Sequence, residues 1–168
     1  PDTREGWVDS VGTLIRAYFT GGADIEFDYS LVRQAGEPIK GFGGTSSGPG
    51  PLKDLHQNIK DTLKKLGGHE ITVRAIVDFM NFIGKAVVSG NVRRTAEIAI
   101  GKPYDDEYLD LKNYKKNPER EVHGWTSNNS IFAELGMDYT NAADRSWHNG
   151  EPGYIWLDNI KGYSRIKN

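Results

Sequence analysis

Residues 84–101 have the sequence GKAVVSGNVRRTAEIAIG, and this stretch decides the fold that we expect. Apolar sequence of helical type leads into a short polar loop with two adjacent arginines, and apolar sequence of strand type follows it. Ser89, Gly90 and Asn91 allow the backbone to turn and present hydrogen-bond donors. Because apolar sequence on both sides would anchor its ends, such a loop can hold an anion and still move.

Apolar residues at three- and four-residue spacing predict three helices, over residues 5–20, 52–66 and 72–87. Gly21-Gly22 and Gly67-Gly68 stop the first two, and Thr72 is the expected cap of the third. The third helix carries an apolar stripe of Ile76, Met80, Ile83 and Val87.

Alternation of apolar and polar residues predicts a strand over residues 25–31 with one buried face. Further strands are expected at 95–100, 127–133 and 154–158, a short acidic helix at 105–112, a charged surface connection at 113–124 and a weak helix at 141–145. Strands that alternate with paired helices predict an α/β fold, and 168 residues favour a single domain.

Composition excludes several functions. The net charge of −2 gives no overall basic field for nucleic acid or a membrane surface. The chain has no cysteine, which excludes disulfides, thiolate zinc sites and a cysteine nucleophile. No signal peptide or membrane span is recognisable. We expect a cytoplasmic protein that is part of something longer, since it begins with proline.

Three segments could carry chemistry, and each has a plainer alternative. The glycine-rich residues 41–51 could cradle a phosphate, although they match no P-loop and could be a simple connection. Arg93 and Arg94 could grip a phosphate or carboxylate, or could only interact with the end of the preceding helix. Asp2 with Glu5 resembles a capping box, while its carboxylate could also bind a sugar hydroxyl. The four histidines are too scattered for a metal pattern.

Five motifs in order resemble the ribonucleotide reductases, most closely the adenosylcobalamin-dependent class II enzymes. They are PDTREGW at 1–7, GFGGTSSGPGPL at 41–52, GKAVVSGNVRRTAEIAIG at 84–101, SNNS at 127–130 and NGEPG at 149–153. The resemblance runs over essentially the whole chain.

This resemblance implies part of a ten-stranded α/β barrel, with residues 1–168 as a single partial domain. It also implies an allosteric site at which a deoxynucleoside triphosphate effector selects the ribonucleotide substrate. The implied effector-binding residues are Asp2, Thr3, Arg33, Lys40, Gly41, Gly43 and Gly44. The implied specificity loop facing the substrate is Ser89, Gly90, Asn91, Val92, Arg93 and Arg94. We expect self-association through the exposed edges of a partial barrel.

The missing cysteines limit what the chain can do. The family abstracts a ribose hydrogen with a thiyl radical in an NxCxE arrangement, and a further cysteine pair supplies the reducing equivalents. We therefore expect no catalytic residue, no metal site and no bound adenosylcobalamin in this segment, and we expect the segment alone to be inactive. The complete parent enzyme would reduce ribonucleoside di- or triphosphates. The alternatives are a stand-alone regulatory module that binds deoxynucleotides and a noncatalytic structural domain on the same scaffold.

Overall fold

The structure, a computed structural model, describes three stretches of the chain: residues 1–41, 43–90 and 94–165. The chain divides into two compact units: unit 1 is residues 1–71 and 82–95, and unit 2 is residues 72–81 and 96–168. Helix α3 (Val73–Val88) gives its first half to unit 2 and its second half to unit 1. None of the helices in the described stretches is long and apolar enough to cross a membrane.

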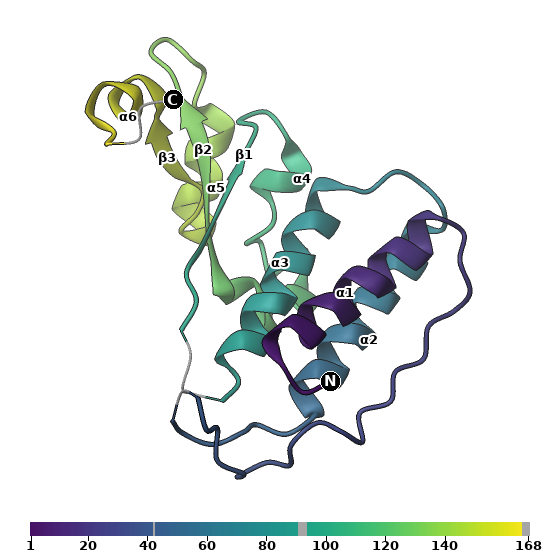
Figure 1. Ribbon diagram of the computed structural model, residues 1–168. Helices are drawn as coiled ribbons and strands as arrows, with labels where there is room; N and C mark the ends of the chain where they lie inside the picture. The colour runs from purple at the N-terminus through teal and green to yellow at the C-terminus, as the bar shows by residue number, and fades with distance from the viewer. Residues whose placement is uncertain (42, 91–93, 166–168) are drawn as a thin grey trace. The chain divides into compact units, whose positions relative to one another are not determined.

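Unit 1 is built on helices α1 (Arg4–Phe19) and α2 (Gly50–Leu66), which pack against each other (Figure 1). Both confirm predicted helices. The apolar residues of α2 that recur at helical spacing are buried: Leu52, Leu55, Ile59, Leu63 and Leu66. Gly67 ends α2 in the left-handed conformation, with φ of 56°, which glycine adopts without a steric penalty.

The predicted strand over residues 25–31 is wrong, because residues 25–29 belong to no sheet and residues 30 and 31 lie in a turn. Its side chains do alternate, with Ile25, Phe27 and Tyr29 half-buried between exposed neighbours. Side chains of α2 bind the segment in place of a neighbouring strand. Lys60 donates to the carbonyl oxygen of Ile25, and Tyr29 bonds to His56. The period of two therefore predicted alternate burial correctly as far as Tyr29, whereas Leu31 is 76% exposed, and the pattern cannot supply a neighbouring strand to pair with.

His56 of α2 is the main contact of this segment, and its side chain is only 2% exposed. The ring stacks on Phe27 at 4.0 Å between centroids, and Nδ1 and Nε2 each lie 2.8 Å from a hydroxyl, of Tyr29 and Ser10 respectively. Ser10 donates its one proton to a backbone carbonyl, so Nε2 carries the ring hydrogen and Nδ1 accepts from Tyr29. Burial, together with the charge of Lys60, lowers the pKa of His56 to about 4.

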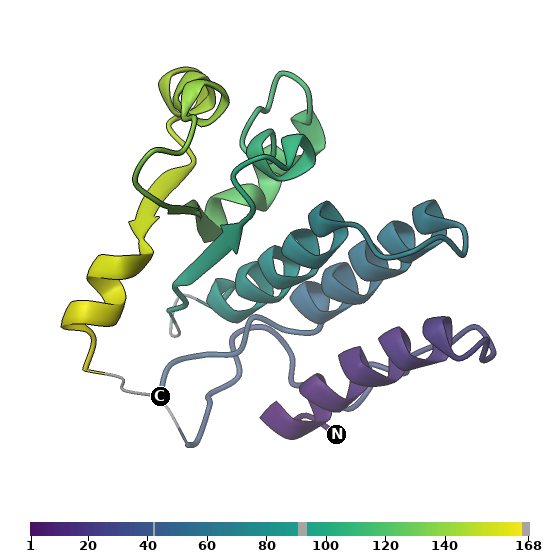
Figure 2. The same ribbon diagram turned by 90° about the horizontal axis from the view of Figure 1, so that it is seen from above.

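Unit 2 contains a parallel sheet with the strand order β1-β2-β3 (Figure 2). Its strands are β1 (Glu97–Gly101), β2 (Ser127–Ala133) and β3 (Gly153–Trp156), in agreement with three predicted strands. Strand β3 ends earlier than expected because an unpredicted helix, α6 (Leu157–Tyr163), begins there. The prediction of an α/β fold is confirmed.

The helices of unit 2 are shorter than those of unit 1. Besides α6 and the first half of α3, they are α4 (Asp106–Leu109), the 3₁₀ turns η1 (Pro118–Val122) and η2 (Gly124–Thr126), and α5 (Thr140–Asn149). The core cluster consists of Val77, Tyr108, Leu109, Leu111, Ile131 and Ala142. The hydroxyl of Tyr108 lies 2.8 Å from the carbonyl oxygen of Ala99 and accepts the N–H of Ser130, so it bridges β1 and β2. Gly101 is needed beside it, since a Cβ there would lie 2.3 Å from the Tyr108 ring.

Helix α3 begins as expected, because Thr72 Oγ1 accepts the N–H of Ala75 at 3.1 Å. Its expected apolar stripe is not the buried side, however: Ile76, Met80 and Val87 are exposed. The buried side instead includes the polar residues Asp78 and Asn81.

Arg120 explains the burial of these two polar residues. It lies in the segment predicted to be a surface connection, yet its side chain is 0% exposed. Its Nε donates to Asp78 at 2.7 Å and Nη2 donates to Asn81 at 3.1 Å, while His123 donates to the same carboxylate at 3.0 Å. Burial alone would raise the pKa of Asp78, but the hydrogen bond from His123 and the charge of Arg120 outweigh it and lower that pKa.

Replacing Asp78 with alanine should be strongly destabilising, because it leaves the buried Arg120 guanidinium without an anionic partner. We expect Asp78→Ala to lower the free energy of unfolding by about 3–5 kcal/mol in urea denaturation. The matched control is Asp158→Ala, which removes an exposed carboxylate of the same unit and should change stability by less than about 0.5 kcal/mol. A loss below about 1 kcal/mol for Asp78→Ala would contradict the buried network.

The neutral His56 should make folding sensitive to acid. Between pH 6.5 and 4 the unfolded chain protonates this histidine and the folded chain does not, so stability falls as pH falls and the effect levels off below about pH 4. When the pH is lowered from 7 to 5, the free energy of unfolding should fall by about 2 kcal/mol less in His56→Gln than in the wild type. The exposed His69 offers the control: His69→Gln should keep the full wild-type loss. An equal loss in wild type and His56→Gln would refute this role.

Candidate functional site

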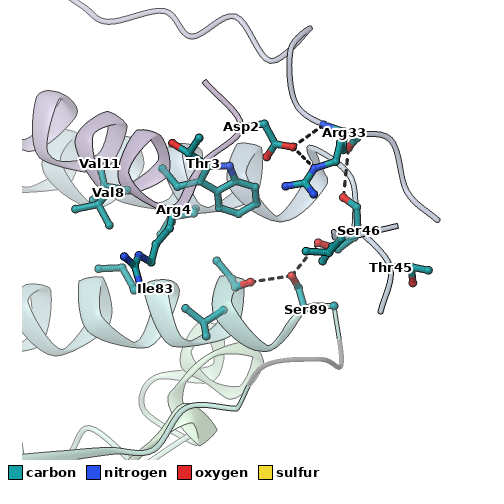
Figure 3. A pocket seen from close by; sticks show the side chains of 17 residues that line it. Asp2, Thr3, Arg4, Val8, Val11, Arg33, Thr45, Ser46, Ile83 and Ser89 are labelled. Atoms are coloured by element: carbon teal, nitrogen blue, oxygen red, sulfur yellow. Dashed lines mark hydrogen bonds and ion pairs between the residues drawn. The ribbon is translucent and has the colours of Figure 1, made fainter. Parts of the chain in front are cut away.

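A cavity of about 280 Å³ lies within unit 1 and has a polar end and an apolar end (Figure 3). It is formed by the first half of α1, the connection between α1 and α2, Leu55 of α2 and the second half of α3. The polar side chains include Asp2, Thr3, Arg4, Arg33, Ser46, Ser47 and Ser89. The apolar side chains include Trp7, Val8, Val11, Ile39, Leu55, Ile83 and Val87.

Asp2 and Arg33 form an ion pair at the polar end. Asp2 Oδ2 accepts a hydrogen bond from Arg33 Nε and a second one, at 3.2 Å, from the backbone N–H of Arg33. Partial burial alone would raise the pKa of Asp2, but the hydrogen bonds and charge of Arg33 outweigh it and lower that pKa. The carboxylate therefore stays ionised at neutral pH.

Asp2 does not cap α1, contrary to the capping-box interpretation. The N-cap is Thr3, whose Oγ1 accepts the N–H of Gly6 at 3.0 Å, and Glu5 instead pairs with Arg4. Because Thr3 accepts the N–H group at the start of the helix, the carboxylate of Asp2 is available to Arg33, which lies 31 positions further along the chain.

The glycine-rich loop folds back on the residues before it. Pro38 and Thr45 form an isolated antiparallel bridge, and Ile39 N–H donates to the carbonyl oxygen of Gly44 at 3.0 Å. Gly43 and Gly44 have φ of 74° and 80°, so glycine is needed at both positions of this turn. Past the turn, Ser46 Oγ donates to the carbonyl oxygen of Arg33 at 3.4 Å.

In the second loop, which is the predicted specificity loop of residues 89–94, the first residue meets the glycine-rich loop. Ser89 Oγ lies 3.3 Å from Ser47 Oγ and 2.8 Å from the carbonyl oxygen of Ala86 in α3. A Cβ at Gly90 would lie 3.7 Å from the carbonyl oxygen of Thr45, so the two loops come close here. A ligand in the cavity could therefore contact both loops at once.

The sequence-predicted site residues divide into three groups. Asp2, Thr3, Arg33, Ser89 and Gly90 line the cavity together. Lys40, Gly41, Gly43, Gly44 and Arg94 lie outside its lining, and Arg94 is exposed. Asn91, Val92 and Arg93 lie outside the described residues.

Sequence analysis missed the two serines of the glycine-rich loop and the apolar wall of the cavity. Ser46 and Ser47 stand within the quoted loop motif, so their hydroxyl groups were a usable signal. Val8, Val11 and Ile83 gave none, because a helical apolar stripe has the same pattern whether it faces a core or a pocket.

Comparisons with known proteins agree on one family. A family model described as "B12-dependent ribonucleotide reductase, insertion domain" matches residues 1–63. The "Probable adenosylcobalamin-dependent ribonucleoside-triphosphate reductase" of Dictyostelium discoideum is 58% identical over 166 residues. The "Adenosylcobalamin-dependent ribonucleoside-triphosphate reductase" of Euglena gracilis is 54% identical over 166 residues.

The structural comparison gives the same result. A crystal structure of a B12-dependent (class II) ribonucleotide reductase matches 99% of this chain with a TM-score of 0.82 and 35% sequence identity. The chain spans 22% and 23% of the length of the Dictyostelium and Euglena relatives, and 23% of the crystallised chain.

Proposed function

We infer that this chain is a segment of an adenosylcobalamin-dependent ribonucleotide reductase, and we propose that its cavity is the site of a deoxynucleoside triphosphate effector. Support for the family comes from matches that cover 99% of the chain in sequence and in structure. Whole relatives are named as ribonucleoside-triphosphate reductases, so the parent would convert ribonucleotides to deoxyribonucleotides. The segment would form one part of the larger barrel domain.

The observation that carries the effector proposal is the meeting of Asp2, Arg33 and Ser89 in one cavity. A guanidinium group and serine hydroxyls suit phosphate oxygens, a carboxylate suits a sugar hydroxyl, and an apolar wall suits a base. Within this proposal the glycine-rich loop contacts the effector, and the second loop, residues 89–94, faces the substrate.

The proposed route from effector to substrate starts at the pair Ser47 and Ser89. An effector that favours one arrangement of the glycine-rich loop would change the partner of Ser89, and so the population of second-loop conformations. By the family resemblance, Arg93 would reach toward the substrate and Arg94 would share that role.

The described residues do not fit adenosylcobalamin. The cavity of about 280 Å³ is too small to enclose a corrin cofactor. The buried His56 has both ring nitrogens committed to hydroxyl groups. Cofactor chemistry would therefore lie in other parts of the parent, and we propose that this segment, which has no cysteine, does not itself reduce ribonucleotides.

The second candidate is a stand-alone regulatory module on the same scaffold. It is favoured by the observation that the cavity is formed entirely within unit 1. Both candidates require nucleotide binding, whereas a purely structural domain does not. The proposed self-association would use β1 and β3, which are the edge strands of the described sheet.

Calorimetric titration of the four deoxynucleoside triphosphates into the chain tests the proposed site. We expect selective binding, and Arg33→Ala should weaken it by about 10–100-fold, since a hydrogen bond to a charged group contributes about 1.5–3 kcal/mol. Arg16→Ala is the control, because Arg16 is an exposed arginine of α1 outside the cavity lining, and it should leave the affinity unchanged. Absence of binding by all four nucleotides would refute the proposal, as would an equal loss in both variants.

A further inference from the structure

Arg33 is fixed by more contacts than an anion-binding arginine on a loop requires. Asp2 Oδ2 accepts both its backbone N–H and its side-chain Nε, and Ser46 Oγ donates to its backbone carbonyl oxygen. The Asp2 side chain is 16% exposed and the Arg33 side chain 37%, so the ion pair is shielded while the guanidinium still reaches the cavity. Figure 3 shows these contacts together at the polar end of the cavity.

These contacts use one edge of the guanidinium only. Among the hydrogen bonds between described residues, Arg33 donates through Nε, and the donors on Nη1 and Nη2 are not used. A guanidinium has five N–H donors in a rigid planar fork, so fixing Nε also fixes the direction of the other four.

We propose that Asp2 is a positioning residue, which orients Arg33 so that its two Nη groups bind the phosphate oxygens of the ligand. This inference rests on the proposed function and adds to Asp2 a role that does not involve the sugar. It explains why one carboxylate oxygen binds both the main chain and the side chain of the same arginine: the two bonds hold the residue at its backbone and at its head group.

The proposal predicts an effect opposite to simple electrostatics. Removing the negative charge of Asp2 from the polar end should strengthen anion binding if only Coulomb interactions matter. If Asp2 orients Arg33, its removal should weaken anion binding, because the freed guanidinium must be ordered when the anion binds. A ligand without a sugar tests the orientation of Arg33 alone, because it has no sugar hydroxyl group that could bind to Asp2.

The experiment is calorimetric titration of inorganic tripolyphosphate into the wild-type chain, Asp2→Ala, Arg33→Ala and the double variant. We expect Asp2→Ala to weaken tripolyphosphate binding by at least about fivefold. In the Arg33→Ala background, Asp2→Ala should cause no further loss, because two residues that act through one contact are not additive. Glu5→Ala is the matched control, since it removes an exposed carboxylate from the same end of α1, and it should bind tripolyphosphate at least as tightly as the wild type.

Folding is checked separately. Thermal unfolding and the Nε–H resonance of Arg33 show whether Asp2→Ala stays folded and has lost the ion pair. Should that variant unfold, Arg33→Lys gives the second test: it keeps the charge but lacks the fork, and we expect it to bind tripolyphosphate as weakly as Arg33→Ala.

The outcomes distinguish this inference from the proposed function. If Asp2→Ala binds tripolyphosphate as tightly as the wild type or more tightly, or if its effect persists in the Arg33→Ala background, the positioning role is wrong while the effector site stands. The positioning role is also wrong, and the effector site also stands, if the wild type binds a deoxynucleoside triphosphate but not tripolyphosphate. If the wild type binds neither, both proposals are wrong.

Discussion

The ion pair between Asp2 and Arg33 is the contact on which the candidate site depends, because it fixes a connection that has little regular structure. Residues 20–49 contain no helix or sheet strand within their described part, so side chains must hold much of this backbone. Lys60 and His56 of α2 hold its first half. Asp2 holds the point at which the connection turns into the glycine-rich loop.

The interior of unit 2 also depends on hydrogen bonds to an arginine side chain. A fully buried guanidinium is tolerated only when its donors have partners, and Arg120 obtains them from Asp78, Asn81 and a backbone carbonyl. Asn81 also donates to Glu97, the first residue of β1, at 3.2 Å. The network thus reaches the first residue of β1.

The candidate site combines residues from two parts of the sequence. Asp2, Arg33 and Ser47 lie within the stretch that matches the insertion-domain family model, whereas Ser89 lies outside it. Because both parts line the cavity, a ligand there could contact the glycine-rich loop and Ser89 together. This arrangement suits the proposed effector role, in which binding energy at the cavity is used to select a loop conformation.

The sequence by itself determined the helices of unit 1, the strands β1 and β2 and the family resemblance, because these depend on local periodicity and on motifs in a fixed order. It could not decide the partners of Asp2, residues 25–31 or Arg120. Asp2 has the same local pattern whether it caps a helix or binds a distant arginine, and alternation predicts the burial of residues 25–29 but not a neighbouring strand. The charged sequence around Arg120 predicts an exposed segment, because its buried partners Asp78 and Asn81 are distant in the sequence. Only the tertiary structure decided these cases, since hydrogen bonds between residues 27 to 42 positions apart depend on how the chain returns to itself.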